Sequence, residues 1–155
     1  MEEVCYTREA ALEKAIEVEQ GSFDIYRKAY SLVQDRHARD LIKEIAFEEL
    51  EHKHTLEKAF FEEGVALHDA DIDEGPSMRL TLFLREKPLD SASTPQDIII
   101  HAIHDEKRSI EFYEKMAHLC AGAPMEKLFS RLCRDENNHL TRLEKLYESI
   151  YMQAM

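Results

Sequence analysis

The sequence predicts an all-α protein: a four-helix bundle of two helical hairpins joined by a long crossover. Three observations predict this class. Four long segments carry apolar residues at steps of three and four positions, which is the period of an amphipathic helix. Short breaks separate the first segment from the second and the third from the fourth. A set of polar residues also recurs at a constant offset of 87 positions, so the two hairpins are expected to be copies of one another.

The first hairpin is predicted to consist of helices over about residues 8–34 and 36–63. Both segments place their apolar side chains on one helical face. The break between them falls near Asp35, and Gly64 follows the second segment. Glycine commonly ends helices because it adopts a left-handed backbone conformation without strain.

The second hairpin is predicted to consist of helices over about residues 95–121 and 124–152. Thr94 can cap the first of them, and Pro95 suits the first helical position because proline lacks the N–H that would be unpaired there. A break around Gly122 separates these two helices.

The crossover is predicted to comprise residues 64–94 of a single domain that spans residues 1–155. Such a segment is long for a compact domain, and fully extended it could reach on the order of 100 Å, against roughly 40 Å for a 25-residue helix. It can therefore run along the outside of the bundle. Residues 78–84 are apolar enough to pack against the bundle or a second subunit, and the pattern leaves open whether they form a helix or a strand.

Composition and charge exclude several classes of function. The net charge of −12 argues against binding to a nucleic-acid backbone, which rewards lysine and arginine. No apolar run approaches the roughly 18 residues of a membrane span, and the N-terminus lacks the apolar region of a signal peptide. The three cysteines, Cys5, Cys120 and Cys133, include no Cys-x-x-Cys pair and suggest no disulfide framework, so a cytoplasmic location is expected.

The residues that recur at the 87-residue offset are two glutamates, a tyrosine and a histidine in each half. They are Glu19, Tyr26, Glu49 and His52 in the first half, and Glu106, Tyr113, Glu136 and His139 in the second. In both halves the histidine follows the second glutamate by three residues, so the two side chains project from one helical face. The apolar periodicity places all four glutamates at core-facing positions midway along their helices.

Four carboxylates in a bundle core would repel one another, and each would lose hydration at a cost of several kcal/mol. Two divalent cations would both neutralise and bridge them. Oxygen and nitrogen ligands suit iron or manganese, with zinc as a possible substitute. The sequence therefore predicts a two-metal site whose ligands are Glu19, Glu49, His52, Glu106, Glu136 and His139.

Simpler interpretations remain open at this point. Glu-x-x-His pairs arise by chance, and the pair Glu51 and His54 points away from the apolar face. The six candidates could be solvated residues, or could bind metal without function. Tyr26 and Tyr113 lie seven residues after a glutamate and are expected to hydrogen-bond to a ligand carboxylate; the alternative is two ordinary core tyrosines.

Two pairs of segments carry a family resemblance. Residues 19–26 (EQGSFDIY) and 106–113 (EKRSIEFY) resemble the first and third helices of the rubrerythrin branch of the ferritin-like superfamily, and residues 47–52 (FEELEH) and 134–139 (RDENNH) resemble its second and fourth. The resemblance spans residues 10–150. It implies a ferritin-like four-helix bundle, a non-haem site with two iron ions, and reduction of hydrogen peroxide or dioxygen.

The chain departs from the family pattern in two respects. Rubrerythrins usually carry another glutamate one turn after the third-helix ligand, where this chain has Ser109, mirrored by Ser22. They also commonly carry a rubredoxin domain, for which this chain lacks the cysteines. Electrons are therefore expected from a separate donor such as a rubredoxin-like protein.

The leading functional hypothesis is a di-iron oxidoreductase that reduces hydrogen peroxide, a rubrerythrin-like peroxidase. Glu49 and Glu136 are expected to bridge the metals, and the remaining four ligands to be terminal. The alternative is a ferroxidase or another iron-handling ferritin-like protein, and a third hypothesis is a metal-free helical interaction module. A storage shell must close around a cavity, whereas a peroxidase can be the homodimer that we expect here.

Overall fold

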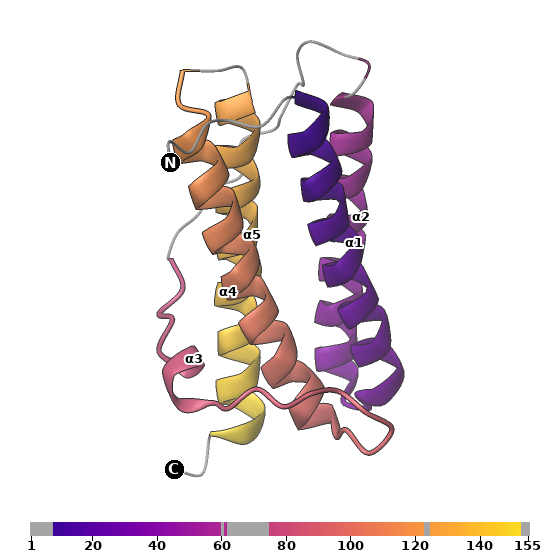
Figure 1. The fold of residues 1–155 in the computed structure, drawn as a ribbon. Helices are drawn as coiled ribbons and strands as arrows, with labels where there is room; N and C mark the ends of the chain where they lie inside the picture. Colours follow the sequence, from indigo (N-terminus) through magenta and orange to yellow (C-terminus); the bar gives the residue numbers. More distant parts are fainter. Residues whose placement is uncertain (1–7, 60, 62–74, 123–124, 153–155) are drawn as a thin grey trace.

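The computed structural model describes residues 8–59, 61, 75–122 and 125–152. These residues form five helices and no strand, which confirms the predicted all-α bundle (Figure 1). The helices are α1 (Arg8–Leu32), α2 (Arg36–Ala59), α3 (Leu80–Phe83), α4 (Pro95–Leu119) and α5 (Met125–Tyr151). The four long helices are the four that the sequence predicts.

The first helices of the two hairpins match in position and length. α4 starts 87 positions after α1 starts, and it ends 87 positions after α1 ends. Three of the predicted helices, those that correspond to α1, α4 and α5, extend one or two residues too far at their C-terminal ends. One reason is visible at the first joint, where the side chain of Asp35 accepts a hydrogen bond from the backbone N–H of Ala38 at 2.8 Å and so caps α2. The predicted end of the second helix, between Ala59 and Gly64, falls largely outside the described residues.

The start of α4 follows its sequence signals. The Thr94 hydroxyl accepts from the backbone N–H of Asp97, and the Asp97 carboxylate accepts from the backbone N–H of Thr94, both at 3.1 Å. This reciprocal pair satisfies two donors that the first helical turn leaves unpaired, and Pro95 occupies the first turn. After α4, Gly122 adopts the left-handed conformation with φ of 83°.

Each long helix packs chiefly against its hairpin partner, α1 against α2 and α4 against α5, and the hairpins meet mainly through α1 and α4. The buried apolar residues form two clusters, one around Ile42, Ile103 and Leu143 and the other around Leu12 and Phe129. Along each long helix the change from one cluster to the other occurs in the region of its buried glutamate. A polar layer therefore divides the hydrophobic core.

The part of the crossover that the structure describes, residues 75–94, lies beside the second hairpin (Figure 1). Its apolar stretch forms the single helical turn α3, which resolves the choice between helix and strand. Leu80 is buried, whereas Leu82 and Phe83 are exposed. The Glu144 carboxylate on α5 accepts hydrogen bonds from the backbone N–H groups just before α3. Residues 64–74 of the predicted crossover lie outside the described residues.

The cysteines differ from one another. Cys133 is a free, half-buried thiol, and burial raises its pKa to about 11. Cys120, buried at the end of α4, is disulfide-bonded, which the sequence does not predict. Cysteine usage therefore does not favour a reducing compartment, and a cytoplasmic location stays a prediction. None of the helices in the described part of the chain is long and apolar enough to cross a membrane.

Candidate metal centre

The polar layer contains one glutamate from each long helix. The four are Glu19 on α1, Glu49 on α2, Glu106 on α4 and Glu136 on α5, and each is 0% exposed. His52 on α2 and His139 on α5 are buried beside them, at 9% and 1% exposure. The structure thus brings together all six residues that the sequence nominates as ligands.

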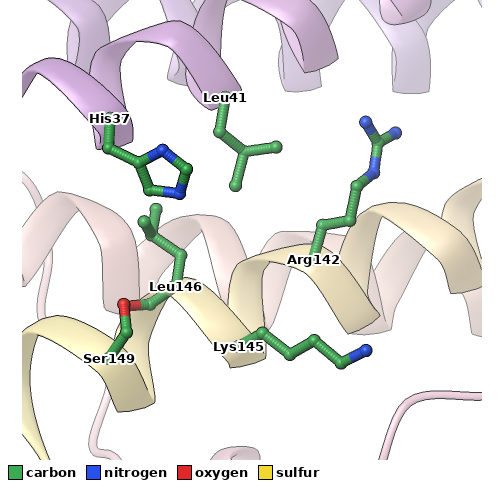
Figure 2. Close-up of a pocket in the computed structure, with 6 residues that line it drawn as sticks. All are labelled: His37, Leu41, Arg142, Lys145, Leu146 and Ser149. Atoms are coloured by element: carbon green, nitrogen blue, oxygen red, sulfur yellow. The ribbon is translucent and has the colours of Figure 1, made fainter.

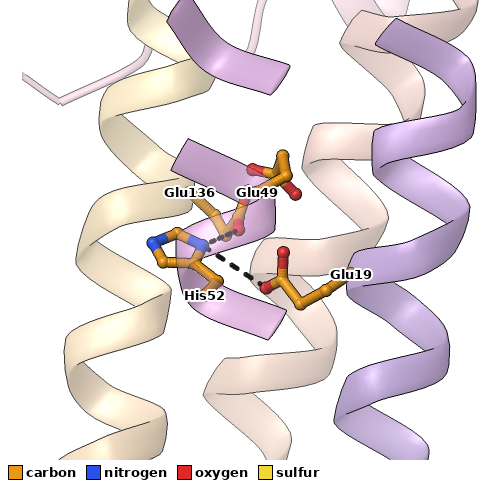
Figure 3. Close-up of side chains that lie close together, drawn as sticks. All are labelled: Glu19, Glu49, His52 and Glu136. Atoms are coloured by element: carbon orange, nitrogen blue, oxygen red, sulfur yellow. Dashed lines mark hydrogen bonds and ion pairs between the residues drawn. The ribbon is translucent and has the colours of Figure 1, made fainter. Parts of the chain in front are cut away.

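These side chains form two overlapping groups, in each of which the potential ligand atoms lie within 4.8 Å of one another. The first group is Glu19, Glu49, His52 and Glu136 (Figure 3). The second group is Glu49, Glu106, Glu136 and His139. Glu49 and Glu136 belong to both groups, which is the position that bridging ligands must occupy.

The two histidines have matching contacts with the carboxylates. His52 Nδ1 lies 3.1 Å from Glu136 Oε1 and 3.5 Å from Glu19 Oε1 (Figure 3). His139 Nδ1 lies 2.7 Å from Glu49 Oε1 and 3.5 Å from an oxygen of Glu106. Each imidazole therefore directs Nδ1 into the layer and meets the second glutamate of the opposite hairpin.

Each of the two tyrosines donates a hydrogen bond to the first glutamate of the other hairpin. The Tyr113 hydroxyl on α4 donates a hydrogen bond to Glu19 Oε1 at 2.7 Å. The Tyr26 hydroxyl on α1 donates to Glu106 Oε1. Burial, followed by the charges of these glutamates, raises the pKa of both tyrosines well above the usual range, so the hydroxyls remain protonated donors. They are not core tyrosines without a polar partner.

Several carboxylate oxygens in the layer lack a hydrogen bond. Glu19 Oε2, Glu49 Oε2 and Glu106 Oε2 are buried and have no hydrogen-bond partner among the described residues. A buried carboxylate oxygen without a partner costs its full desolvation free energy. The tyrosines occupy Oε1 of Glu19 and Glu106, so the orphan atoms are the ones left for a cation. The donor set therefore fits two divalent metal ions.

The protonation preferences of the glutamates are unequal. Burial, followed by the charge of Glu136, raises the pKa of Glu19, Glu49 and Glu106. Burial acts in the same direction on Glu136, but hydrogen bonding with Glu106 and the charge of His139 outweigh it and hold the pKa of Glu136 well below its usual value. One of the four carboxylates is thus the preferred anion.

The histidines gain charge in spite of their burial. Desolvation alone would lower the pKa of each imidazole. Hydrogen bonding to Asp135 and Glu136 raises the pKa of His52 well above its usual value, and the charges of Glu136 and Glu49 do the same for His139. Without metal, the layer is therefore built around protonated imidazoles and the Glu136 anion.

Two carboxylates outside the layer hold the histidines, and the sequence interpretation missed both. His139 Nε2 lies 3.1 Å from Glu48 Oε2, and His52 Nε2 lies 3.0 Å from Asp135 Oδ2. Partners of this kind fix the ring orientation of a metal-binding histidine. A signal was available, because Glu48 and Asp135 are themselves separated by 87 positions and each directly precedes a bridging candidate.

The position one helical turn after Glu106, occupied by Ser109, carries no carboxylate. Ser109 and Ser22 are both buried, and the Ser22 hydroxyl donates a hydrogen bond to Asp105 Oδ2 at 2.7 Å. Burial raises the pKa of Asp105 to about 6, although the bond from Ser22 acts against this. Asp105 on α4 has Val18 as its counterpart on α1, so this contact breaks the equivalence of the halves.

The sequence gives the remaining histidines no partner at ligand spacing on an inward face, which predicts a surface position for them, and for two of them this prediction is wrong. His101 Nδ1 lies 2.9 Å from Glu86 Oε2, and His104 Nε2 lies 2.7 Å from the backbone oxygen of Leu84. Both are partly buried because the crossover covers this face of α4. His37, His54 and His118 are exposed as expected, and His68 lies outside the described residues.

A comparison with family models matches residues 10–147 to the family described as Rubrerythrin. The matched range includes all six clustered ligand candidates and both tyrosines. Searches of curated proteins and of solved structures found no match.

Proposed function

Because this chain belongs to the rubrerythrin family and has its ferritin-like bundle, we propose that it is a non-haem di-iron oxidoreductase that reduces hydrogen peroxide. The observation that carries the proposal is the pair of overlapping ligand groups sharing Glu49 and Glu136 in a buried layer. Shared carboxylates keep two metal ions a few ångströms apart, so that both can act on one small oxidant.

The metal pair would be held by six side chains of four helices. Glu49 and Glu136 would bridge, Glu19 and His52 would complete one ion, and Glu106 and His139 the other. Oxygen with nitrogen ligands favours iron, with manganese or zinc as substitutes. When bound, a pair of ferrous ions supplies the two electrons that, with two protons, convert one hydrogen peroxide into two waters.

The protein's own groups prepare this chemistry. The tyrosine hydroxyls fix one oxygen of Glu19 and of Glu106, so that each terminal carboxylate presents its other oxygen as a single ligand. Full burial of the four glutamates excludes bulk water, which strengthens every electrostatic interaction inside the layer. A separate electron carrier, such as a rubredoxin-like protein, would return the site to its reduced state.

Anaerobic stopped-flow spectroscopy tests the proposal. Protein loaded with two ferrous ions per chain is mixed with hydrogen peroxide or with dioxygen. We expect much faster oxidation by peroxide, with one peroxide consumed per two irons. Faster oxidation by dioxygen, with iron accumulating far beyond two per chain in a closed shell, would overturn the peroxidase in favour of the ferroxidase alternative. The expected homodimer is measured in the same samples by light scattering.

A matched pair of variants controls for the metal site. Glu49→Gln removes a bridging candidate, whereas Glu51→Gln changes an exposed glutamate two positions away that also precedes a histidine by three residues. We expect Glu49→Gln to lose bound iron and peroxide oxidation, and Glu51→Gln to retain both. Equal behaviour of the two variants would remove the layer from the mechanism.

A further inference from the structure

The 87-residue correspondence of the two halves fails at a position next to the outer carboxylates. Arg142 follows His139 by three residues on α5, and the residue in the equivalent position after His52 on α2 is Thr55. The ligands on the inner side of the two histidines are the same in both halves. The difference therefore concerns only the groups around the carboxylate that contacts Nε2 of each histidine, on the side away from the layer.

Arg142 donates a hydrogen bond to Glu48, the carboxylate that contacts His139. Its Nη2 donates a hydrogen bond to Glu48 Oε2, the same oxygen that lies 3.1 Å from His139 Nε2. Its Nη1 lies 3.3 Å from Glu44 Oε1. Glu48 on α2 thus contacts two side chains of α5, Arg142 and His139. The Glu48 side chain is 35% exposed, so without the bond from Arg142 it could exchange His139 for water.

The support of His52 is built differently. Asp135 Oδ2 lies 3.0 Å from His52 Nε2, and the cation beside Asp135 is Arg131, whose Nε lies 3.4 Å from Asp135 Oδ1. Arg131 and Asp135 are one turn apart on the same helix, so this pair does not tie α5 to α2. Thr55 carries no charge to do so. His52 is also the more exposed of the two histidines, at 9% against 1%.

Arg142 stands at the wall of an open hollow between α2 and α5 (Figure 2). The hollow has a volume of about 360 Å³ and is lined by His37, Leu41, Arg142, Lys145, Leu146 and Ser149. A small side chain in place of Arg142 would extend this hollow toward Glu48, which Arg142 now contacts. Arg142 therefore lies between this hollow and the carboxylate that supports His139.

We propose that Arg142 is a positioning residue that makes the two halves of the centre unequal, so that the group containing His139 takes up its metal ion first and holds it more tightly. The inference rests on the metal centre of the proposed function, but not on its reaction with peroxide. A charge-assisted hydrogen bond fixes Glu48, Glu48 fixes the ring of His139, and a fixed ring loses less freedom when it binds metal.

Zinc titration of the metal-free protein tests the order of binding. The protein is labelled with ¹⁵N in its histidines, the resonances of His52 and His139 are assigned with His52→Gln, and each is followed by NMR as zinc is added. We expect the first equivalent to shift His139 and the second to shift His52. Simultaneous shifts, or His52 first, would overturn the proposal.

Exchanging the two unequal residues sharpens the test. Arg142→Thr should weaken binding at His139 about 10-fold, at the lower end of the effect typical of such partners, and so bring the two steps together. Thr55→Arg should instead strengthen the second step by giving Asp135 a cation from α2. Arg134→Thr, which removes an exposed charge of α5, is the control and should change neither step.

The outcomes separate this inference from the proposed function. Equal weakening at both histidines in Arg142→Thr would show a general loss of structure and would overturn the positioning role. Ordered zinc binding by a protein whose ferrous form ignores peroxide would sustain the inference and end the peroxidase proposal. Absence of any zinc shift at either histidine would end both.

Discussion

The two hairpins of this bundle agree closely in the layer that faces the centre and differ at several positions outside it. Inside, hydrogen bonds are exchanged in reciprocal pairs: Tyr26 to Glu106 and Tyr113 to Glu19. Outside, Val18 stands opposite Asp105, Gly21 opposite Arg108, and Thr55 opposite Arg142. The residues of the layer must together form the two overlapping ligand groups. A residue outside the layer can change in one half without a matching change in the other.

The crossover is one source of this difference. Its described residues cover the second hairpin, where Glu86 binds the Arg108 guanidinium through two hydrogen bonds of 2.7 and 2.9 Å. The equivalent position on α1 is Gly21, which has no side chain to make such a bond. The inner agreement therefore reflects the demands of the site, and the outer disagreement reflects what each hairpin packs against.

Metal removal should give the largest effect, because it exposes both halves to the repulsion among their carboxylates. Ligand binding at about 1,000 times the dissociation constant stabilises the folded state by roughly 4 kcal/mol. For a domain of this size that corresponds to a rise in Tm on the order of 10 °C. Calorimetry of metal-free and iron-loaded protein measures it. Glu19→Gln combined with Glu106→Gln removes one terminal ligand from each half, and its Tm should not respond to metal; a response would contradict the ligand assignment.

The bridging candidates should behave oppositely in the metal-free protein, although they are equivalent in the repeat. The pKa of Glu136 is lowered by folding, so its stabilisation is present above the unfolded pKa and is lost as the pH falls through the folded pKa. Glu136→Gln should therefore cost roughly 3 kcal/mol at pH 7, because it removes the anion that both buried imidazoles share.

The pKa of Glu49 is raised by folding, so this carboxyl lowers stability as the pH rises above its unfolded pKa. Glu49→Gln should then make the metal-free protein more stable at pH 7, because it removes one source of repulsion in the buried layer. Urea unfolding of both variants provides the comparison. Two losses of similar size would show that the layer is electrostatically symmetric, against the pKa directions.

The two tyrosines test whether the inner halves are energetically equal as well as geometrically matched. Tyr26→Phe and Tyr113→Phe each leave one buried carboxylate oxygen without its donor, at a cost of about 1–2 kcal/mol in the metal-free protein. Chemical unfolding should give similar values for both. Tyr30→Phe, which changes an exposed tyrosine of α1, serves as the control. A gap larger than about 1 kcal/mol between the two buried sites would break the equivalence.

The smallest expected effect comes from two glycines, one from each half. A Cβ added at Gly21 meets nothing within 4 Å, so the close approach of a neighbouring helix that could explain a glycine there does not exist. Gly21→Ala should stabilise the protein by about 0.5–1 kcal/mol. Gly122→Ala should instead destabilise it, because φ of 83° strains a residue with a Cβ. Thermal unfolding decides, and a loss for Gly21→Ala would contradict the open environment.

The repeat made the inner layer predictable. Each ligand candidate interrupts an apolar face, and an interruption that recurs at a fixed offset is visible without any structure. The helix ends were harder to predict from the sequence, because they depend on capping residues such as Asp35. The apolar periodicity does not show that Asp35 caps the following helix instead of continuing the preceding one. Residues 80–83 could not be assigned, since a single helical turn is too short for its apolar residues to repeat with the helical period.

Glu48 and Asp135 show a different limit of sequence reasoning. Each lies one position from a core-facing glutamate, about 100° around the helix, where charged residues are ordinary. Only the antiparallel packing of α2 against α5 turns them toward the histidine of the neighbouring helix. His101 and His104 were misplaced for a similar reason, because their burial comes from the crossover rather than from the face of α4 on which they lie.

Neither hairpin contains a complete metal group, since each group combines residues of α1 or α4 with residues of both α2 and α5. A chain of half this length could therefore assemble the same centre only as a symmetric pair. In such a pair every substitution would appear twice, and an arginine placed after one histidine would also follow the other. Joining the halves in one polypeptide removes that constraint. The fused chain can alter one metal's surroundings while leaving the other's untouched, a freedom that no symmetric dimer possesses.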